Sequence, residues 1–146
     1  MAGADAFRVS AAGICLNPQN QMLVLKHRFR EENPWGLPGG LLKRGEGPTD
    51  GLIREIREET GLEPTVEDII SAHGEGEAIH LIYLLRVPAA EPDLQEGEIR
   101  DYRWVPLANH DLTLSPAQED AVERVAKRLH AQRDKLPVRL TTVMLW

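Results

Sequence analysis

The sequence predicts a single domain that combines strands and helices, of the α/β or α+β class. Its 146 residues, of which 42% are hydrophobic and 27% charged, match the size and composition of one compact globular domain. Apolar, β-rich runs are interspersed with two segments of helical character, and no internal repeat, linker or low-complexity tract interrupts them. We therefore expect residues 1–146 to form one domain around one hydrophobic core.

The first forty residues contain strand patterns and turn residues. Residues 7–16 (FRVSAAGICL) and 21–27 (QMLVLKH) are apolar and β-rich, and residues 17–20 (NPQN) between them favour a turn. This arrangement predicts a hairpin. Residues 34–40 (PWGLPGG) hold too much proline and glycine for a long element, so we expect a short strand that leads into a loop.

The first helix is expected to begin near Pro48 and to end at Gly61. Proline is tolerated in the first turn, where its missing N–H would have no partner, and glycine is favoured just beyond the last turn. Gly51 inside this helix costs about 1 kcal/mol of helix propensity relative to alanine. We expect this glycine to affect stability and packing rather than chemistry.

The second half of the chain predicts three more strands and a second helix. Residues 68–73 and 78–87 (AIHLIYLLRV) are expected to be strands, the latter apolar enough for the centre of a sheet. A polar, proline-containing loop at 88–97 precedes an alternating strand at 99–105 (IRDYRWV). The second helix starts at Ser115 with a pattern like a capping box. Its apolar face is formed by Val122, Val125, Ala126 and Leu129.

The last segment, residues 136–146 (LPVRLTTVMLW), is unusually apolar for a terminus. A segment of this character avoids water, so we expect it to pack either on its own domain or on a second copy of the chain. Packing within the same chain is the simpler arrangement. The other arrangement would make the protein a homodimer.

Charge and cysteine content restrict the partners and the compartment. The formal net charge is -6, with 23 Asp and Glu against 17 Lys and Arg, which argues against binding of nucleic-acid polymers through a broad basic face. Cys15 is the only cysteine, so neither an intramolecular disulfide nor a thiolate zinc site is expected, as suits a cytoplasmic protein. No apolar run approaches the roughly 18 residues of a membrane span, and we expect neither membrane insertion nor export.

The most informative feature is a group of acidic residues in the first helix. Glu55, Glu58 and Glu59 stand at i, i+3 and i+4, so their carboxylates project from one helical face with β-carbons about 5–6 Å apart. Three like charges repel each other, and a hard cation such as Mg²⁺ or Mn²⁺ would remove the repulsion. The charges alone would also fit a solvated helix face opposite a buried apolar one.

The residues around this helix strengthen the case for a metal site. Gly39 and Gly40 carry no side chain, so their backbone groups can approach a metal or a phosphate closely. Arg54 lies one turn before Glu58, and the loop is short enough to bring Glu46 alongside it. A bidentate ion pair of this kind would fix the loop to the helix.

Residues 40–62 (GLLKRGEGPTDGLIREIREETGL) resemble the Nudix box, Gly-x5-Glu-x7-Arg-Glu-aliphatic-x-Glu-Glu-x-Gly-aliphatic, at every defined position. The preceding residues 35–40 (WGLPGG) are similar to the approach to the box in many members of that family. The resemblance implies the Nudix α/β/α sandwich with a central mixed sheet. It covers nearly the whole chain, and only the part after about Asp134 falls outside it.

The resemblance also implies an activity, the metal-dependent hydrolysis of a phosphoanhydride bond in a nucleoside diphosphate derivative. The implied cofactor is Mg²⁺, with Mn²⁺ as a substitute. Arg54 would orient the carboxylates of the box, and Glu46 would help to hold the loop. The implied metal ligands are Glu55, Glu58, Glu59 and the carbonyl oxygen of Gly39.

A general base is also needed to take a proton from the attacking water. Some family members use a glutamate of the box and others a glutamate of a later loop, so the resemblance leaves both open. Glu96 and Glu98, just before residues 99–105, are the candidates outside the box, and we expect Glu98 to act in catalysis. Each of them alone would equally suit a solvated loop.

Phosphate contacts are expected from the second strand and the glycine loop. Residues 26–30 (KHRFR) form the densest basic stretch of the chain, and we expect Arg28 and Arg30 to bind phosphate oxygens. A solubilising strand end would explain either residue alone. Backbone groups of Gly39 and Gly40 are expected to contact the substrate as well.

Aromatic and histidine side chains give weaker indications. Trp35 or Phe29 is a candidate for stacking on a base, although an aromatic residue beside a Pro-Gly-Gly turn more often serves packing. His80, inside an apolar run, is expected to be a strand residue rather than a catalyst.

The box does not select the substrate, which we expect to be a small nucleotide. Oxidised nucleoside triphosphates, ADP-ribose, nucleotide sugars and dinucleoside polyphosphates all remain open. A second class of function is a catalytically silent Nudix domain that binds a nucleotide as a sensor. Such domains usually lose glutamates of the box, and this chain has all of them. RNA decapping is disfavoured, because the sequence contains no extended basic segment.

Overall fold

The computed structural model describes residues 6–135, which contain seven strands and two helices. The strands are β1 (Arg8–Leu16), β2 (Met22–His27), β3 (Trp35–Gly36), β4 (Gly39–Leu41), β5 (Thr65–Glu75), β6 (Ala78–Arg86) and β7 (Ile99–Val105). The helices are α1 (Pro48–Thr60) and α2 (Pro116–Asp134). Both helices and the strands β1, β2, β6 and β7 lie where the sequence predicts them, and β5 is longer than predicted.

The seven strands form one mixed sheet that consists of two groups of strands. The groups meet where β1 pairs with β2. In the first group, β1 and β6 lie parallel from Arg8↔Ala78 to Leu16↔Arg86, with β5 antiparallel to β6 and β4 antiparallel to β1. In the second group, β2 pairs antiparallel with both β3 and β7. The predicted hairpin forms at its turn, with Leu16 opposite Met22. The two strands then diverge: β4 pairs with residues 10–12 of β1, and β2 pairs with β3 and β7 instead.

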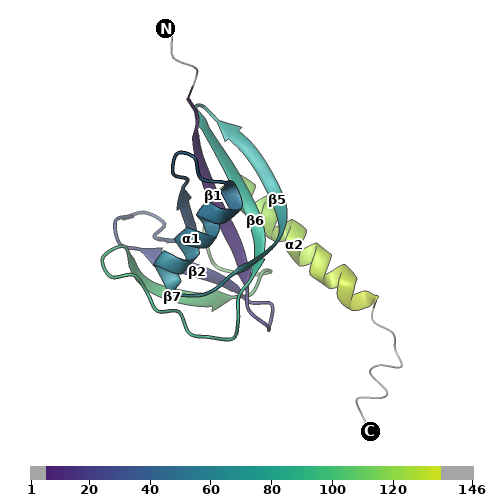
Figure 1. Ribbon diagram of the computed structural model, residues 1–146. Coiled ribbons are helices and arrows are strands. Elements are labelled where there is room, and N and C mark those ends of the chain that lie inside the picture. Colours follow the sequence, from purple (N-terminus) through teal and green to yellow (C-terminus); the bar gives the residue numbers. More distant parts are fainter. Residues whose placement is uncertain (1–5, 136–146) are drawn as a thin grey trace.

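Alternation along the central strands divides the core into two halves. On β1, Cys15 belongs to the cluster that includes α1, whereas Ile14 belongs to the cluster that includes α2. Leu85 and Leu84 of β6 follow the same rule, as the period of two in a strand requires. The two helices cover opposite faces of the sheet (Figure 1). The expected α/β/α sandwich with a central mixed sheet is therefore confirmed.

Helix α1 begins and ends as its sequence predicts. Pro48 occupies the first turn, and Gly61 closes the helix in the left-handed conformation (φ 68°), where its N–H donates to the carbonyl of Arg57. Leu52 and Ile56 are fully buried, each a contribution of about 1.5–3 kcal/mol relative to exposure. Their burial fixes the rotation of the helix and hence the direction of its acidic side chains.

Gly51 is required by packing, as expected, and the structure shows which residues it contacts. A β-carbon at this position would lie 2.5 Å from Cδ2 of Leu42 and 2.7 Å from a carboxylate oxygen of Glu46. An alanine would favour the helical conformation but would displace the residues that connect the loop to the helix. The glycine therefore leaves room for the loop at the start of α1.

Two segments differ from the sequence prediction. β5 spans Thr65–Glu75 rather than residues 68–73, because it pairs with β6 from end to end. Register shifts after Val66 and Ile69 interrupt the alternation that would have marked the ends of β5. Residues 34–40 form two short strands rather than one, because β3 pairs with β2 whereas β4 pairs with β1.

Gly39 allows β4 to lie close against β1. Its φ of 145° is unfavourable for residues with a side chain. A β-carbon there would overlap the carbonyl oxygen of Ala11 and lie 2.8 Å from Cα of Ala12. Because Gly39 and Gly40 are the register partners of Ala12 and Ala11, the glycine loop lies at the edge of the sheet, in contact with α1.

Residues 136–146 lie outside the described residues. The packing of the apolar tail on its own domain or across a homodimer therefore stays a prediction. Within residues 6–135, neither helix has the length and apolar character needed to cross a membrane.

Candidate active site

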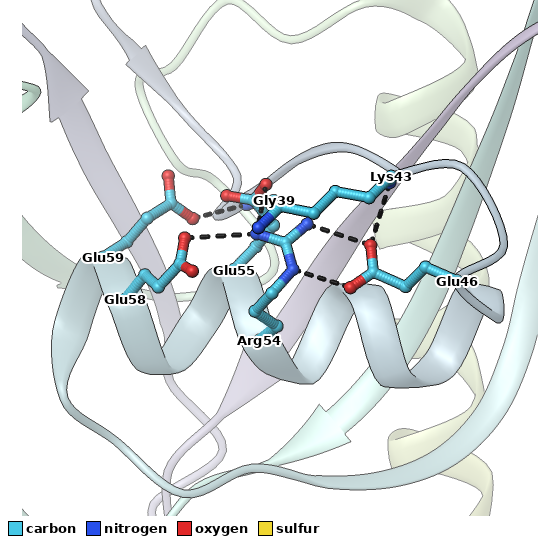
Figure 2. A network of polar contacts seen from close by, with 7 residues as sticks. All are labelled: Gly39, Lys43, Glu46, Arg54, Glu55, Glu58 and Glu59. Atoms are coloured by element: carbon cyan, nitrogen blue, oxygen red, sulfur yellow. Dashed lines mark hydrogen bonds and ion pairs between the residues drawn. The ribbon is translucent and has the colours of Figure 1, made fainter.

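Arg54 lies at the centre of the acidic face of α1 and contacts three carboxylates (Figure 2). Its Nε and Nη2 donate to the two oxygens of Glu46 at 2.7 and 3.0 Å, which makes a bidentate pair. Its Nη1 donates to Glu55 at 3.2 Å and to Glu58 at 3.1 Å. The pairing of Arg54 with Glu46 and Glu58 agrees with the spacing in the sequence.

Glu46 fixes the loop before α1 to the helix. Its Oε1 also accepts a hydrogen bond from the backbone N–H of Lys43 at 2.9 Å. The bonds from Arg54 and then from Lys43 lower the pKa of Glu46 from 4.5 to about 2, so this carboxylate stays charged at neutral pH. The guanidinium of Arg54 thus makes two hydrogen bonds to Glu46 of the loop and one longer hydrogen bond to each of Glu55 and Glu58 of its own helix.

Glu59 is almost completely buried, with 3% of its surface exposed. One of its carboxylate oxygens accepts a hydrogen bond from the backbone N–H of Gly39 at 2.9 Å (Figure 2). Burial, reinforced by the charges of Glu55 and Glu98, raises the pKa of Glu59 from 4.5 to about 8. In the absence of a cation, Glu59 is therefore mainly protonated at neutral pH.

Glu55 lies against the second glycine of the loop. A β-carbon on Gly40 would lie 2.8 Å from Oε1 of Glu55, so any side chain at position 40 would displace this carboxylate. Burial raises the pKa of Glu55 even though Arg54 contacts it. Glu55 and Glu59 thus both lie at the glycine loop, and the protein compensates the charge of neither completely.

The three glutamates of the helix do not converge on one point. Glu58 is about half exposed (47% of its side chain) and turns toward Arg54, whereas Glu55 and Glu59 turn toward the loop. In the described part of the chain, no group of three or more His, Cys, Asp or Glu side chains surrounds a common ion position. The donor set still suits a hard divalent cation, because it consists of carboxylate and backbone oxygens. It includes the buried carboxylate of Glu59 and the partly buried carboxylate of Glu55, both without full counter-charge.

Glu98 approaches the acidic site from the loop before β7. Its charge raises the pKa of both Glu55 and Glu59, so it lies near both carboxylates. Its carbonyl accepts a hydrogen bond from the N–H of Arg28 at 2.8 Å, which ties this loop to the end of β2. Glu96 has no such effect on either carboxylate. Of the two loop glutamates proposed from the sequence, Glu98 is the one that the fold brings to the helix.

The two arginines that the sequence singles out differ in their relation to the acidic site. The charge of Arg30 lowers the pKa of Glu59, although the opposing effect of burial is larger. Arg30 therefore lies near the carboxylate of Glu59. The side chain of Arg28 is exposed, and Arg28 contacts the loop of Glu98 through its backbone. Phosphate binding by these residues stays a prediction.

His27, at the end of β2, lies near Arg30. The sequence alone does not assign it a role in the site. Its Nε2 is buried and has no hydrogen-bond partner within residues 6–135. Burial, with a contribution from Arg30, lowers the pKa of His27 from 6.5 to about 4, so the ring is neutral at physiological pH. Its surroundings depend on the pairing of β2 with β3 and β7, and no local sequence signal reveals that pairing.

Trp35 is not brought to the acidic site. It packs against the core cluster on the α2 side of the sheet, whereas the glutamates belong to α1 on the other side. The guanidinium carbon of Arg103 lies 4.2 Å from the centroid of the Trp35 ring, and Nζ of Lys26 lies 5.9 Å from it. The ring therefore stacks on Arg103, and the packing role considered for it in the sequence fits this position better than stacking on a base.

The arrangement defines a class of protein: an α/β/α sandwich in which a glycine loop at the sheet edge meets an acidic helix. Residues 6–126 match the family model of the NUDIX domain, and the chain belongs to this family. The resemblance found in residues 40–62 is thereby confirmed.

Several named proteins are similar to this chain. The ADP-ribose pyrophosphatase of Methanocaldococcus jannaschii is 31% identical over 117 residues, which cover 70% of this chain and 67% of that protein. The RNA pyrophosphohydrolase of Psychrobacter cryohalolentis is 39% identical over 71 residues, which cover 49% of this chain and 40% of that protein. Nudix hydrolase 2 of Arabidopsis thaliana is 28% identical over 108 residues, which cover 68% of this chain. The match spans only 39% of the length of that plant relative.

Solved structures share the fold. A putative Nudix hydrolase from Chromobacterium violaceum superposes with a TM-score of 0.63 and 26% identity, covering 98% of this chain and 90% of that one. The MutT protein from Methanosarcina mazei Go1 superposes with a TM-score of 0.67 and 23% identity, covering 87% of this chain and 98% of that one. The mixed sheet between two helices is thus common to both.

The buried carboxylate of Glu59 predicts how the stability of the metal-free protein depends on pH. Its pKa is higher in the folded chain, about 8, than the ordinary 4.5, so the folded state holds the proton more tightly. The stabilisation is complete below about pH 4.5 and is lost as the pH rises through about 8. We expect the free energy of unfolding, measured by urea in the presence of a chelator, to fall over this range by at most about 1.4 kcal/mol per pH unit.

The variant Glu59→Gln isolates this effect. His27, with a pKa lowered to about 4, favours the folded state as the pH rises, but it acts equally in wild type and variant and cancels in their difference. Glu63→Gln changes an exposed glutamate paired with Arg57 and is expected to keep the decline between pH 4.5 and 8. A wild-type curve parallel to that of Glu59→Gln would refute the assignment.

Proposed function

We propose that the protein hydrolyses a phosphoanhydride bond in a nucleoside diphosphate derivative with the help of a divalent cation. The observation that carries this proposal is the pair of carboxylates of Glu55 and Glu59, which lie against the glycine loop at Gly39 and Gly40. Nearby positive charge does not offset the effect of burial, and the pKa of each carboxylate is raised. Burying such charges is costly unless a cation joins them. Membership of the Nudix family supports the same conclusion.

The proposed cation is Mg²⁺, with Mn²⁺ as a substitute, because carboxylate and carbonyl oxygens are the ligands that these ions prefer. A bound cation neutralises charge on the phosphate oxygens and activates water as a nucleophile. The residues that would hold it are Glu55, Glu58, Glu59 and the carbonyl of Gly39. Arg54 would keep the carboxylates in position through the contacts that it makes to Glu46, Glu55 and Glu58.

Glu98 is the proposed general base. It lies near Glu55 and Glu59 but on a separate loop, so it is available for a role other than binding the cation. Its side chain is exposed, which leaves the carboxylate accessible to water. In this arrangement the box glutamates bind the cation, Glu98 takes a proton from the attacking water, and Arg30 offers positive charge to the phosphates.

The buried cysteine is consistent with a proposed location in the cytoplasm. Cys15 lies in the core without a disulfide, and burial raises the pKa of its thiol. A thiol in this state is a packing residue rather than a nucleophile. A reducing compartment suits it best.

A panel of nucleotides tests the proposed activity. We expect release of phosphate or of a nucleoside monophosphate from one of these: an oxidised nucleoside triphosphate, ADP-ribose, a nucleotide sugar or a dinucleoside polyphosphate. The release should require Mg²⁺ or Mn²⁺. Glu59→Gln should lower it by about 10²-fold or more, since even residues that only support a metal ligand contribute 10–100-fold. Tight nucleotide binding without turnover on any of these compounds would favour a sensor domain instead.

Matched variants of the loop before β7 test the assignment of the base. We expect Glu98→Gln to lower kcat by about 10²–10⁴-fold, the usual contribution of a general base. Glu96→Gln, two residues away on the same loop, should stay within about twofold of wild type, as surface substitutions do. Measurement of kcat for both variants at saturating Mg²⁺ separates them, and equal effects would remove Glu98 from this role.

A further inference from the structure

The loop between β6 and β7 is attached to the last turn of α1. The backbone N–H of Asp93 donates to the carbonyl oxygen of Thr60 at 2.7 Å. The N–H of Gln95 donates to the carbonyl oxygen of Glu59 at 3.1 Å. Carbonyl groups in the last turn of a helix have no partner within the helix, so another segment has to satisfy them. Residues 93–98, the linking loop, therefore complete the end of the helix that carries the proposed cation ligands.

Apolar contacts hold the same loop in place. Leu94, between the two donating residues, is partly buried and packs against the core cluster on the α1 side, which includes Leu62. A β-carbon on Gly61 would lie 3.3 Å from Cβ of Asp93, so the loop passes directly over the residue that closes α1. The first half of the linking loop is therefore fixed to the helix by both backbone and side-chain contacts.

The second half of the linking loop is fixed at its other end. The N–H of Ile99 donates to the carbonyl oxygen of Gln95 at 3.4 Å, which closes a turn over residues 96–98. Ile99 itself is buried at the start of β7. The carbonyl oxygen of Glu98 accepts the N–H of Arg28, just beyond the end of β2, at 2.8 Å. Glu98 thus lies in a short turn that is connected on one side to α1 and on the other to the end of β2.

This turn depends on the backbone conformation of Gly97. The φ of Gly97 is 97°, a value that residues with a side chain rarely adopt. A β-carbon at this position would meet no atom within 4 Å, so the backbone conformation rather than a lack of space requires glycine. Of the two glutamates that flank it, only Glu98 affects the pKa of Glu55 and of Glu59. At Gly97 the chain thus passes from Glu96, which has no such effect, to Glu98, which lies near the acidic site.

We propose that Gly97 is a positioning residue for Glu98. Its positive φ, within a turn that is fixed at both ends, sets the direction in which the Glu98 side chain leaves the loop. The inference rests on the proposed hydrolase function, in which Glu98 takes a proton from the attacking water. Because Gln95 binds the backbone of Glu59, the loop also keeps the base at a fixed place relative to one of the proposed cation ligands.

Amide hydrogen exchange tests the attachment of the linking loop without any turnover. The full chain, labelled with ¹⁵N, is transferred to deuterated water, and the loss of each amide signal is followed by NMR. We expect the amides of Asp93 and Gln95 to exchange at least about tenfold more slowly than in an unfolded chain of the same sequence, because both are hydrogen-bonded. If both exchange at the unfolded rate, the inference is wrong, even when the protein hydrolyses nucleotides.

Two matched glycine substitutions test the role of Gly97 in the reaction. Gly97→Ala should lower kcat by about tenfold or more with KM nearly unchanged, because a displaced catalytic group affects the chemical step. Gly76, in the turn between β5 and β6, also has a positive φ (59°) and no atom within 4 Å of a β-carbon position. Gly76→Ala should therefore lower the melting temperature by a similar amount, but keep kcat within about twofold of wild type.

A double variant separates positioning from general destabilisation. In a chain that already carries Glu98→Gln, Gly97→Ala should change kcat by no more than about twofold, because the carboxylate that it displaces is gone. An equal fall in kcat in both backgrounds, or a wild-type kcat in Gly97→Ala, would overturn the inference.

A conservative variant provides a rescue. Asparagine adopts a positive φ more readily than alanine does, and three asparagines of this protein do so. Gly97→Asn should therefore keep more of the wild-type kcat than Gly97→Ala, and it takes the place of Gly97→Ala in the comparison if that variant does not fold. Slow exchange at Asp93 and Gln95 without turnover of any nucleotide would remove the hydrolase function and, with it, this role of Gly97.

Discussion

The hydrogen bond from the amide of Gly39 to the buried carboxylate of Glu59 joins the edge of the sheet to the acidic helix. Gly39 reaches Glu59 because β4 lies against β1 at a separation that leaves no space for a β-carbon. Glu59 is held in place by the burial of Leu52 and Ile56, two turns and one turn earlier on α1. Any outward movement of β4 would therefore release Glu59 and alter the surroundings of Glu55 together.

Arg54 contacts three of the carboxylates at the acidic helix but does not neutralise their combined negative charge. Arg54 makes its bidentate contact with Glu46, and the pKa of that carboxylate falls. At Glu55 and Glu59 burial has the larger effect, and their pKa values rise. The acidic face is thus suited to a cation and to phosphates, whereas the opposite face has a cavity whose lining contains neither lysine nor arginine.

Features set by neighbours in the sequence could be predicted, and features set by distant pairing could not. The limits of α1 and the contacts of Arg54 follow from residues within one or two turns or a short loop. The length of β5, the division of residues 34–40 into two strands and the stacking of Trp35 on Arg103 depend on partners far along the chain. For the same reason, His80 was correctly expected in a strand, but its position beside His73 was not foreseen.

Binding of Mn²⁺ to the full chain tests most directly whether the carboxylates at the glycine loop form a cation site. Isothermal titration calorimetry would compare wild type with Glu59→Gln and with Glu63→Gln, which alters an exposed glutamate paired with Arg57. The account predicts that Glu59→Gln weakens Mn²⁺ binding by at least about tenfold, whereas Glu63→Gln binds as wild type does. Equal affinity of wild type and Glu59→Gln for Mn²⁺ would contradict it.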